Sequence, residues 1–175
     1  MTIRDTGSIP DPTEEDCYAD IEAAYQYLIT ERGLNHSQIV LYGRSLGSGP
    51  SCYLANKTSR EGKPVAGLIL HSPFTSVYRV VFDLGFTLVG DKFSNIDRIA
   101  DVDCPVLIVH GHEDAIIPIE HGQALLDAVP PKMRAEPFFV RGMGHNGFEY
   151  HIGGFLLPCM MLPRLPACLF AHDSF

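Results

Sequence analysis

The sequence has few cysteines, and no two of them form the CxxC pair of a structural zinc site. Their number is odd, which a closed set of disulfides would not leave. A disulfide scaffold and a zinc cluster are therefore not expected, and a reducing compartment fits better. Each cysteine is predicted to act as a small buried hydrophobic side chain. The five are Cys17, Cys52, Cys104, Cys159 and Cys168.

Basic residues are also scarce. The chain of 175 residues has 13 lysines and arginines against 21 aspartates and glutamates, so its formal net charge is −8. This balance argues against nucleic acid as a partner, because the chain lacks the excess of basic residues that would neutralise the phosphates. The hydrophobic content of 46% is that of a globular protein, and the length fits one domain.

The first 16 residues lack the apolar core of a secretory leader, so a cytoplasmic protein is expected. The run at residues 152–171 is apolar and long enough to cross a bilayer, but Pro158, Pro163 and Pro166 interrupt it. Arg164 would cost about 2.5–3.5 kcal/mol deep in a membrane. We therefore expect an α/β domain over residues 1–151 and an apolar, proline-interrupted tail over residues 152–175 that packs on it.

Helical and strand-like patterns alternate along the domain. Apolar residues recur at helical spacing, whereas the runs between them are short, apolar and continuous. This alternation predicts a mostly parallel sheet of about four strands with helices on both faces. The long stretch 73–104 should form an excursion over the strand ends, where it would roof a pocket. Helices are expected at 15–33, 48–58 and 119–130, and strands at 39–43, 65–72, 105–111 and 136–142.

A single serine stands between two glycines where the first strand meets the second helix, in Gly43-Arg44-Ser45-Leu46-Gly47. This pattern matches G-x-S-x-G, the nucleophile elbow, in which a sharp strand-to-helix turn exposes the serine hydroxyl. The turn leaves no room for side chains at Gly43 and Gly47. The alternative is a purely structural role, as a glycine-rich turn whose serine caps the helix.

A serine hydroxyl is a weak nucleophile unless a base takes its proton and an acid orients that base. Asp114 directly follows the third predicted strand and His145 follows the fourth, in the order serine, acid, histidine. Ligands of parallel sheets bind beyond the carboxyl ends of the strands, where all three residues should meet. The alternatives are that Asp114 caps a helix and that His145 is an ordinary loop residue.

Other residues compete for these roles. Asp103 precedes its strand and should lie at the wrong end of the sheet, and Glu113 should point elsewhere on its turn. His71 ends the second strand and is expected to have a packing or hydrogen-bonding role. His110 and His112 form an H-x-H pair, which with Asp114 could serve a metal-dependent hydrolase. Gly111 should end the strand there and separate the two imidazoles, so no metal is expected.

The chain resembles the α/β-hydrolase superfamily at Gly43–Gly47, Asp114 and His145. The segments "PTEEDCYADIEAAYQYL", "ILHSPFTSVYRVVF", "FSNIDRIADVDCPVLIVHGHEDAIIPIEHG" and "GMGHN" are similar to the α/β-hydrolase domain-containing protein 17 family of protein depalmitoylases. The resemblance extends from about residue 12 to residue 149. The motifs are shared with Bem46-like proteins and lysophospholipases, so the fold is better indicated than the substrate.

The resemblance implies a thioesterase that acts on S-palmitoylated proteins at cytosolic membrane faces without a cofactor. Ser45 would be the nucleophile, Asp114 the orienting acid and His145 the general base, and the Leu46 N–H would hold the oxyanion. Alternatives are a lysophospholipase or carboxylesterase, and a non-catalytic fragment that binds a partner.

The chain also departs from the family. Family members have several strands before the helix at residues 15–33, and a loop after one of them supplies the second oxyanion N–H. Neither that loop nor the family's cysteine-rich lipid anchor is present in this sequence. We therefore expect the C-terminal half of the fold, with impaired activity. The strand at 39–43 should have one open, apolar edge through which copies associate.

Overall fold

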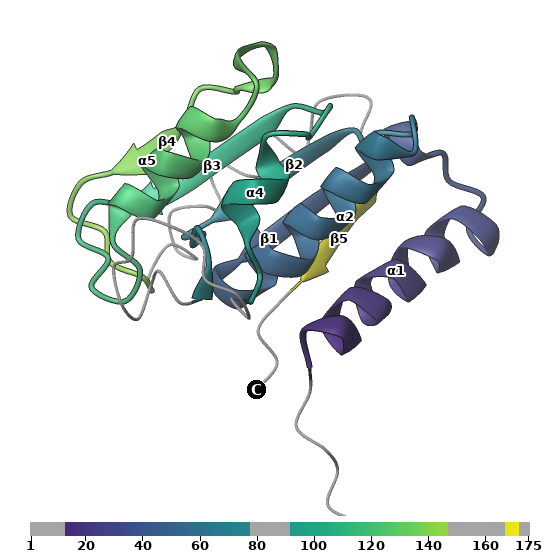
Figure 1. The fold of residues 1–175 in the computed structure, drawn as a ribbon, viewed down its shortest axis with the longest axis horizontal. Coiled ribbons are helices and arrows are strands. Elements are labelled where there is room, and N and C mark those ends of the chain that lie inside the picture. Colours follow the sequence, from purple (N-terminus) through teal and green to yellow (C-terminus); the bar gives the residue numbers. More distant parts are fainter. Residues whose placement is uncertain (1–12, 78–91, 147–166, 172–175) are drawn as a thin grey trace, which may run out of the picture.

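The centre of the protein is a sheet of five parallel strands in the order β4-β3-β2-β1-β5 (Figure 1). The computed structural model describes residues 13–77, 92–146 and 167–171. The central strands are continuous apolar runs, as expected when both faces of a parallel sheet are buried. The predicted α/β fold class is confirmed, with one strand more than expected. The strands are β1 (Ile39–Arg44), β2 (Gly67–His71), β3 (Val106–Gly111), β4 (Phe138–Val140) and β5 (Ala167–Ala171).

Helices alternate with the strands as the sequence pattern predicts. The described helices all pack on one face of the sheet, and none contributes to the apolar cluster on the other face, so the expected helices on both faces are not found among the described residues. The first helix begins at a capping box, in which the Thr13 hydroxyl accepts from the Asp16 N–H and the Asp16 carboxylate accepts from the Thr13 N–H. A short helix, α4, lies in the part of the 73–104 excursion that is described. The middle of that excursion, and with it the predicted roof, lies outside the described residues. The helices are α1 (Glu14–Thr30), α2 (Ser48–Arg60), α4 (Asn95–Ile99) and α5 (Ile119–Ala128).

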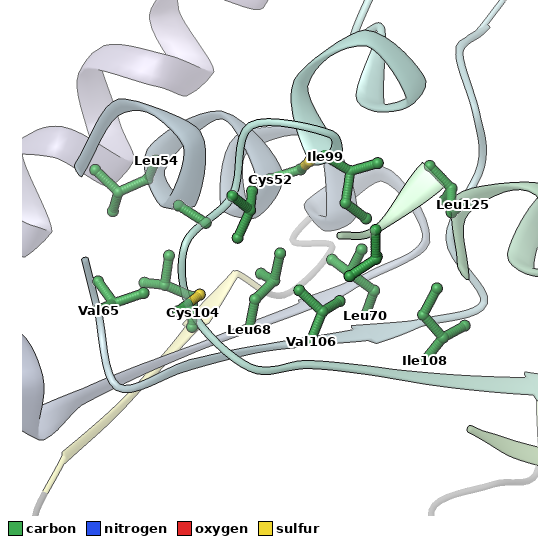
Figure 2. Close-up of a cluster of buried hydrophobic side chains, with 14 of the residues drawn as sticks. Cys52, Leu54, Val65, Leu68, Leu70, Ile99, Cys104, Val106, Ile108 and Leu125 are labelled. Carbon is green, nitrogen blue, oxygen red and sulfur yellow. The ribbon is translucent and has the colours of Figure 1, made fainter. Parts of the chain in front are cut away.

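The main hydrophobic core lies between the sheet and the helices (Figure 2). Alternate residues of the strands, among them Leu41, Leu68 and Val106, meet Leu54 of α2 and Leu125 of α5. Each is almost completely buried, which stabilises the fold by about 1.5–3 kcal/mol per large side chain. The core thereby fixes the carboxyl ends of β1 and β3 relative to one another.

The cysteines are small apolar side chains where the structure describes them. Cys52 and Cys104 are buried in the main core, and burial raises the pKa of each thiol to about 12. Cys17 is half-buried. The side chains of Cys159 and Cys168 lie outside the described part of the chain.

The predicted open edge of β1 is wrong. Five residues of the tail form β5, which pairs with β1 in parallel from Ile39↔Ala167 to Gly43↔Ala171. In Figure 1 this strand, drawn in yellow, lies along the side of β1 that faces away from β2. The strand could not be predicted from the sequence, because it follows three closely spaced prolines and its partner strand lies far away in the chain.

Deleting residues 167–175 is expected to expose the β1 edge and to cause association. An unpaired, apolar strand edge is a template for pairing with another copy. Size-exclusion chromatography with light scattering should show oligomers that grow with protein concentration. A shorter deletion, of residues 172–175, leaves β5 in place and is the matched control. An unchanged mass for the longer deletion would show that β5 does not protect the edge.

Within the described ranges, no helix combines the length and apolarity needed to span a bilayer. The apolar run at 152–171 lies outside these ranges except for residues 167–171, which form the strand β5.

Candidate active site

Ser45 occupies the sharp turn between β1 and α2. Its φ angle is 48°, a left-handed conformation that costs a residue with a side chain about 1–3 kcal/mol and is found mainly at functional sites. Two contacts support the turn: the Ser48 hydroxyl donates to the Ser45 carbonyl over 2.6 Å, and Gly43 lies directly against the backbone of Gly47. A strained serine after a buried strand is the local geometry that the G-x-S-x-G pattern predicts.

Replacing Gly43 with alanine is expected to destabilise the protein by about 3 kcal/mol. The added Cβ would lie 2.4 Å from the Gly47 carbonyl oxygen and 2.7 Å from the Ser51 hydroxyl, so the elbow backbone must shift. Gly67→Ala is the matched control in the neighbouring strand, because its Cβ would meet only the Pro105 carbonyl, at 3.5 Å. Urea denaturation measures the free energy of unfolding of both variants. Equal midpoints for the two variants would show that the elbow has room for a methyl group.

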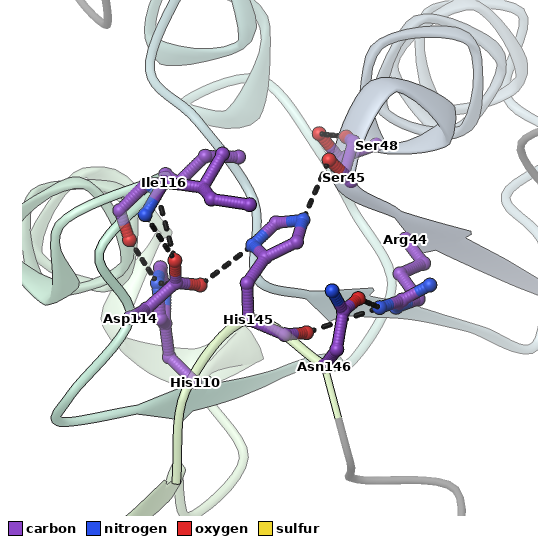
Figure 3. Close-up of polar contacts among 9 residues, drawn as sticks. Arg44, Ser45, Ser48, His110, Asp114, Ile116, His145 and Asn146 are labelled. Atoms are coloured by element: carbon purple, nitrogen blue, oxygen red, sulfur yellow. Dashed lines mark hydrogen bonds and ion pairs between the residues drawn. The ribbon is translucent and has the colours of Figure 1, made fainter.

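The His145 imidazole bridges Ser45 and Asp114 (Figure 3). Its Nε2 lies 3.1 Å from the Ser45 hydroxyl oxygen, and its Nδ1 lies 2.8 Å from Asp114 Oδ2. The residues come from loops after three different strands, β1, β3 and β4, and meet at the carboxyl edge of the sheet. We refer to these three side chains as the Ser45–His145–Asp114 array.

Backbone hydrogen bonds hold the Asp114 carboxylate in place. Its Oδ1 accepts from the N–H groups of Ile116 and Ile117, at 2.9 and 2.8 Å, while Oδ2 faces His145. Burial by itself would raise the pKa of Asp114, but the hydrogen bonds from Ile117, His145 and Ile116 together lower it. Asp114 is therefore ionised at neutral pH.

The ionised carboxylate determines where the imidazole proton lies. A carboxylate can only accept, so His145 Nδ1 must carry a hydrogen and donate it to Asp114. In the neutral ring Nε2 is then an acceptor, and the Ser45 hydroxyl donates to it. This is the tautomer that can remove the proton from the serine.

His110 lies beneath Asp114 and supports the same turn. Its Nε2 donates to the Ile117 carbonyl over 2.8 Å and lies 3.4 Å from Asp114 Oδ2. Burial lowers the pKa of His110, so the ring is neutral. Gly122 of α5 allows this packing, because a Cβ there would lie 2.6 Å from His110 Nδ1. The sequence pattern drew attention to His110 only as half of an H-x-H pair.

The competing residues lie where the sequence analysis expects them. Asp103 is exposed at the opposite end of the sheet and pairs with Lys132. Glu113 turns away and accepts from the Gly142 N–H. The Nδ1 atom of His71 lies 2.8 Å from the Tyr42 hydroxyl, which gives the buried ring a hydrogen-bonding role.

The H-x-H pair does not share a face. Gly111 ends β3, His110 is buried, and His112 is exposed beside the Phe139 ring. Among the described residues, no group of three or more His, Cys, Asp and Glu side chains is arranged to hold a metal ion.

Two polar side chains at the site, those of Arg44 and Asn95, have no signal in the sequence pattern. Arg44 Nη2 donates to the His145 carbonyl and to the Asn146 side chain, at 3.0 and 2.6 Å. The buried Asn95 donates to the Phe74 carbonyl and to the hydroxyl of Ser48, which holds the elbow. No local motif predicts contacts between residues so far apart in the chain.

An apolar cluster borders the serine. The half-buried Leu46 side chain packs with Phe74, Phe93 and Ile117. Ile116, on the turn that carries Asp114, is 58% exposed. Hydrocarbon side chains therefore lie beside the nucleophile on the Leu46 side, together with the polar groups of the array, Arg44 and Ser48.

Comparison with known proteins identifies the family of the chain. The sequence profile of the prolyl oligopeptidase family matches residues 8–146, which include the whole array. The chain belongs to the prolyl oligopeptidase family of α/β hydrolases. The predicted membership in the α/β-hydrolase superfamily is confirmed.

Among curated proteins, the chain is similar to alpha/beta hydrolase domain-containing proteins. Human alpha/beta hydrolase domain-containing protein 17B is 43% identical over 80% of this chain, which corresponds to 46% of the relative. Protein 17C of Xenopus tropicalis is also 43% identical, over 80% of this chain and 43% of its own length. The chain thus spans less than half the length of these relatives.

Solved structures show the same fold for this member of the prolyl oligopeptidase family. An α/β hydrolase from Vibrio vulnificus has a TM-score of 0.67 at 20% identity, covering 86% of this chain and 57% of that one. A monoacylglycerol lipase from Paleococcus ferrophilus has a TM-score of 0.58 at 17% identity, covering 85% and 74%. At these identities the likeness concerns the fold alone.

Proposed function

We propose that this protein is a serine acyl hydrolase whose substrates are S-palmitoylated proteins. The observation that carries the proposal is the array: the Ser45 hydroxyl lies 3.1 Å from His145 Nε2, and His145 Nδ1 lies 2.8 Å from Asp114. A base within hydrogen-bond reach of a serine, itself oriented by a carboxylate, is the arrangement that activates a serine nucleophile.

The reaction would proceed by acyl transfer. His145 takes the Ser45 proton as the hydroxyl oxygen attacks the acyl carbonyl, and Asp114 stabilises the imidazolium that forms. The tetrahedral intermediate collapses to an acyl-Ser45 as the bond to the leaving thiolate breaks, and the His145 imidazolium returns its proton to the departing sulfur, so that the imidazole is neutral again. Water activated by His145 then cleaves this ester and regenerates the serine.

The Leu46 N–H is the candidate donor for the oxyanion. Leu46 follows the nucleophile in the turn Ser45–Gly47, which leads directly into α2, so the positive end of that helix also faces the developing charge. In α/β hydrolases a second N–H comes from a loop of the other half of the fold. A hydrolase supplied with only one such donor would be slower by roughly 10²–10³-fold.

Three considerations favour a long-chain acyl thioester among the possible substrates. The sequence resembles the depalmitoylase family, and curated relatives from that family are 43% identical. The side chains of Leu46 and Ile116 beside the array would offer apolar contact to an acyl chain. A thiolate leaving group, with a pKa of about 8.5, also needs little protonation.

The test is hydrolysis of a palmitoyl-thioester reporter by the purified chain, followed by mass mapping of a fluorophosphonate adduct. We expect turnover that resists chelators, and an adduct on Ser45. Hydrolysis of oxyesters without thioesters would replace the depalmitoylase assignment by a carboxylesterase or lysophospholipase. Loss of activity with chelator would favour a metal enzyme. No turnover together with no adduct would leave a non-catalytic α/β fragment.

A further inference from the structure

The guanidinium of Arg44 connects the strand of the nucleophile to the loop of the histidine. Arg44 is the last residue of β1, and its backbone is paired in register with His71 of β2. One of its nitrogens, Nη2, donates to the His145 carbonyl over 3.0 Å and to Asn146 Oδ1 over 2.6 Å (Figure 3). The sheet thus fixes one end of this side chain, and the other end holds the backbone that carries the imidazole.

The loop of residues 141–146 is otherwise tied to the side of Asp114. The Glu113 N–H donates to the Met143 carbonyl over 2.9 Å, and the Gly142 N–H donates to the Glu113 carboxylate over 3.1 Å. Gly111 lies so close that a Cβ there would be 2.2 Å from the Met143 carbonyl oxygen. These contacts fix the loop to the end of β3, and none of them joins the loop directly to the turn that carries Ser45.

Within the described residues, the hydrogen bonds that reach this loop from the nucleophile strand come from Arg44 and from Ser45 itself. The bond from Ser45 is the one that changes during catalysis, because its proton moves to the imidazole. A second connection that does not involve this proton would hold His145 at attacking distance while the proton moves. The Arg44 guanidinium meets this condition, because it only donates and its hydrogen bonds go to the loop rather than to the imidazole.

We propose that Arg44 is a positioning residue for the acyl-transfer reaction, which sets the distance between His145 and Ser45 by clamping the loop of residues 141–146. The role rests on the proposed hydrolase function. Arg44 contacts the carbonyl and the neighbouring side chain of the base rather than the reacting atoms, so its loss should affect the chemical step and leave substrate binding unchanged.

The test compares Arg44→Ala with Arg134→Ala. Arg134 is a matched control at the other end of the sheet, because its guanidinium also donates to two backbone carbonyls, those of Val129 and Asp127 at 2.8 and 2.6 Å. We expect Arg44→Ala to lower kcat by about 10–100-fold with KM unchanged, since a displacement of about 1 Å costs rates of this order. Guanidinium ion at non-denaturing concentration should restore part of that rate. Arg134→Ala should show neither effect.

Hydrogen exchange provides a readout that does not depend on activity. In Arg44→Ala the amides of His145 and Asn146 should exchange faster, whereas those of His112 and Glu113 keep the wild-type rate. Unchanged exchange in the loop, or faster exchange with an unchanged kcat, would overturn the proposal. A fall in kcat that guanidinium ion cannot restore would also overturn it. If the wild-type protein hydrolyses no ester or thioester, the proposed function fails, and the exchange rates alone decide whether Arg44 clamps the loop.

Discussion

Replacing Ser45 with alanine is expected to lower acyl-thioester turnover by roughly 10⁶-fold, the loss seen when a serine hydrolase is deprived of its nucleophile. The variant cannot form the acyl-enzyme at this position, because the Ser45 hydroxyl is the one described within hydrogen-bond distance of His145 Nε2, at 3.1 Å. Steady-state turnover of a palmitoyl-thioester reporter measures the effect, and a fluorophosphonate probe should no longer label the protein.

Ser37→Ala is the control for this variant. Ser37 lies in an exposed turn where its hydroxyl contacts only Asn35 among the described hydrogen bonds, so its removal should leave turnover within about twofold. A Ser45→Ala protein that melts like the wild type but keeps a substantial fraction of its activity would exclude Ser45 as the nucleophile.

Replacing Asp114 with asparagine is expected to lower kcat by about 10⁴-fold although the shape of the side chain is kept. The amide oxygen must occupy the Oδ1 position, because two N–H groups, those of Ile116 and Ile117, point at it. The NH₂ group then faces His145 Nδ1 and donates to it. The imidazole is forced into the tautomer with its proton on Nε2, which cannot accept the proton of Ser45.

The loss of protein stability at acidic pH offers a second measurement on the same variant. The pKa of Asp114 is lower in the folded protein than its ordinary value of 3.8. The carboxylate therefore contributes stability that is present above about pH 4 and is lost as the pH falls through the lower, folded value. Asp114→Asn should lack this contribution, so its melting temperature should fall less on acidification than that of the wild type.

Asp103→Asn is the matched control for both measurements. Asp103 is exposed, and its only described ion pair is with Lys132 at the opposite end of the sheet. Exposed pairs of this kind contribute about 0–1 kcal/mol, so neither kcat nor the acid dependence should change appreciably. If Asp114→Asn kept the wild-type kcat, the carboxylate would not be what orients His145.

Much of this architecture could be predicted from local sequence patterns. Continuous apolar runs identified β1, β2 and β3, because strands buried on both faces cannot alternate with polar residues. A short apolar run also indicated β4, whose residues are half-buried. The helical spacing of apolar residues identified α1, which begins one residue before the predicted start at residue 15. The glycines around Ser45 indicated a crowded turn, which agrees with the close approach of Gly43 to the Gly47 backbone.

Other features could not be predicted because their partners are distant in the chain. The strand Ala167–Ala171 lies in a proline-rich tail, and only its pairing with β1 makes it a strand and closes the edge that we expected to be open. The contacts of Arg44 with His145 and of Asn95 with Ser48 span 101 and 47 residues, so no local motif indicates them.

The parallel α/β fold, the sharp turn at the serine and the order of serine, carboxylate and histidine follow from the amino-acid order. These depend on hydrophobic periodicity and on backbone sterics, which act between near neighbours. The folded structure was needed to show that the imidazole lies within reach of both partners, that Asp114 accepts from two N–H groups, and that Arg44 connects the histidine loop to the strand. Such contacts arise when the sheet brings strand ends together, because packing rather than local preference sets distances between remote residues.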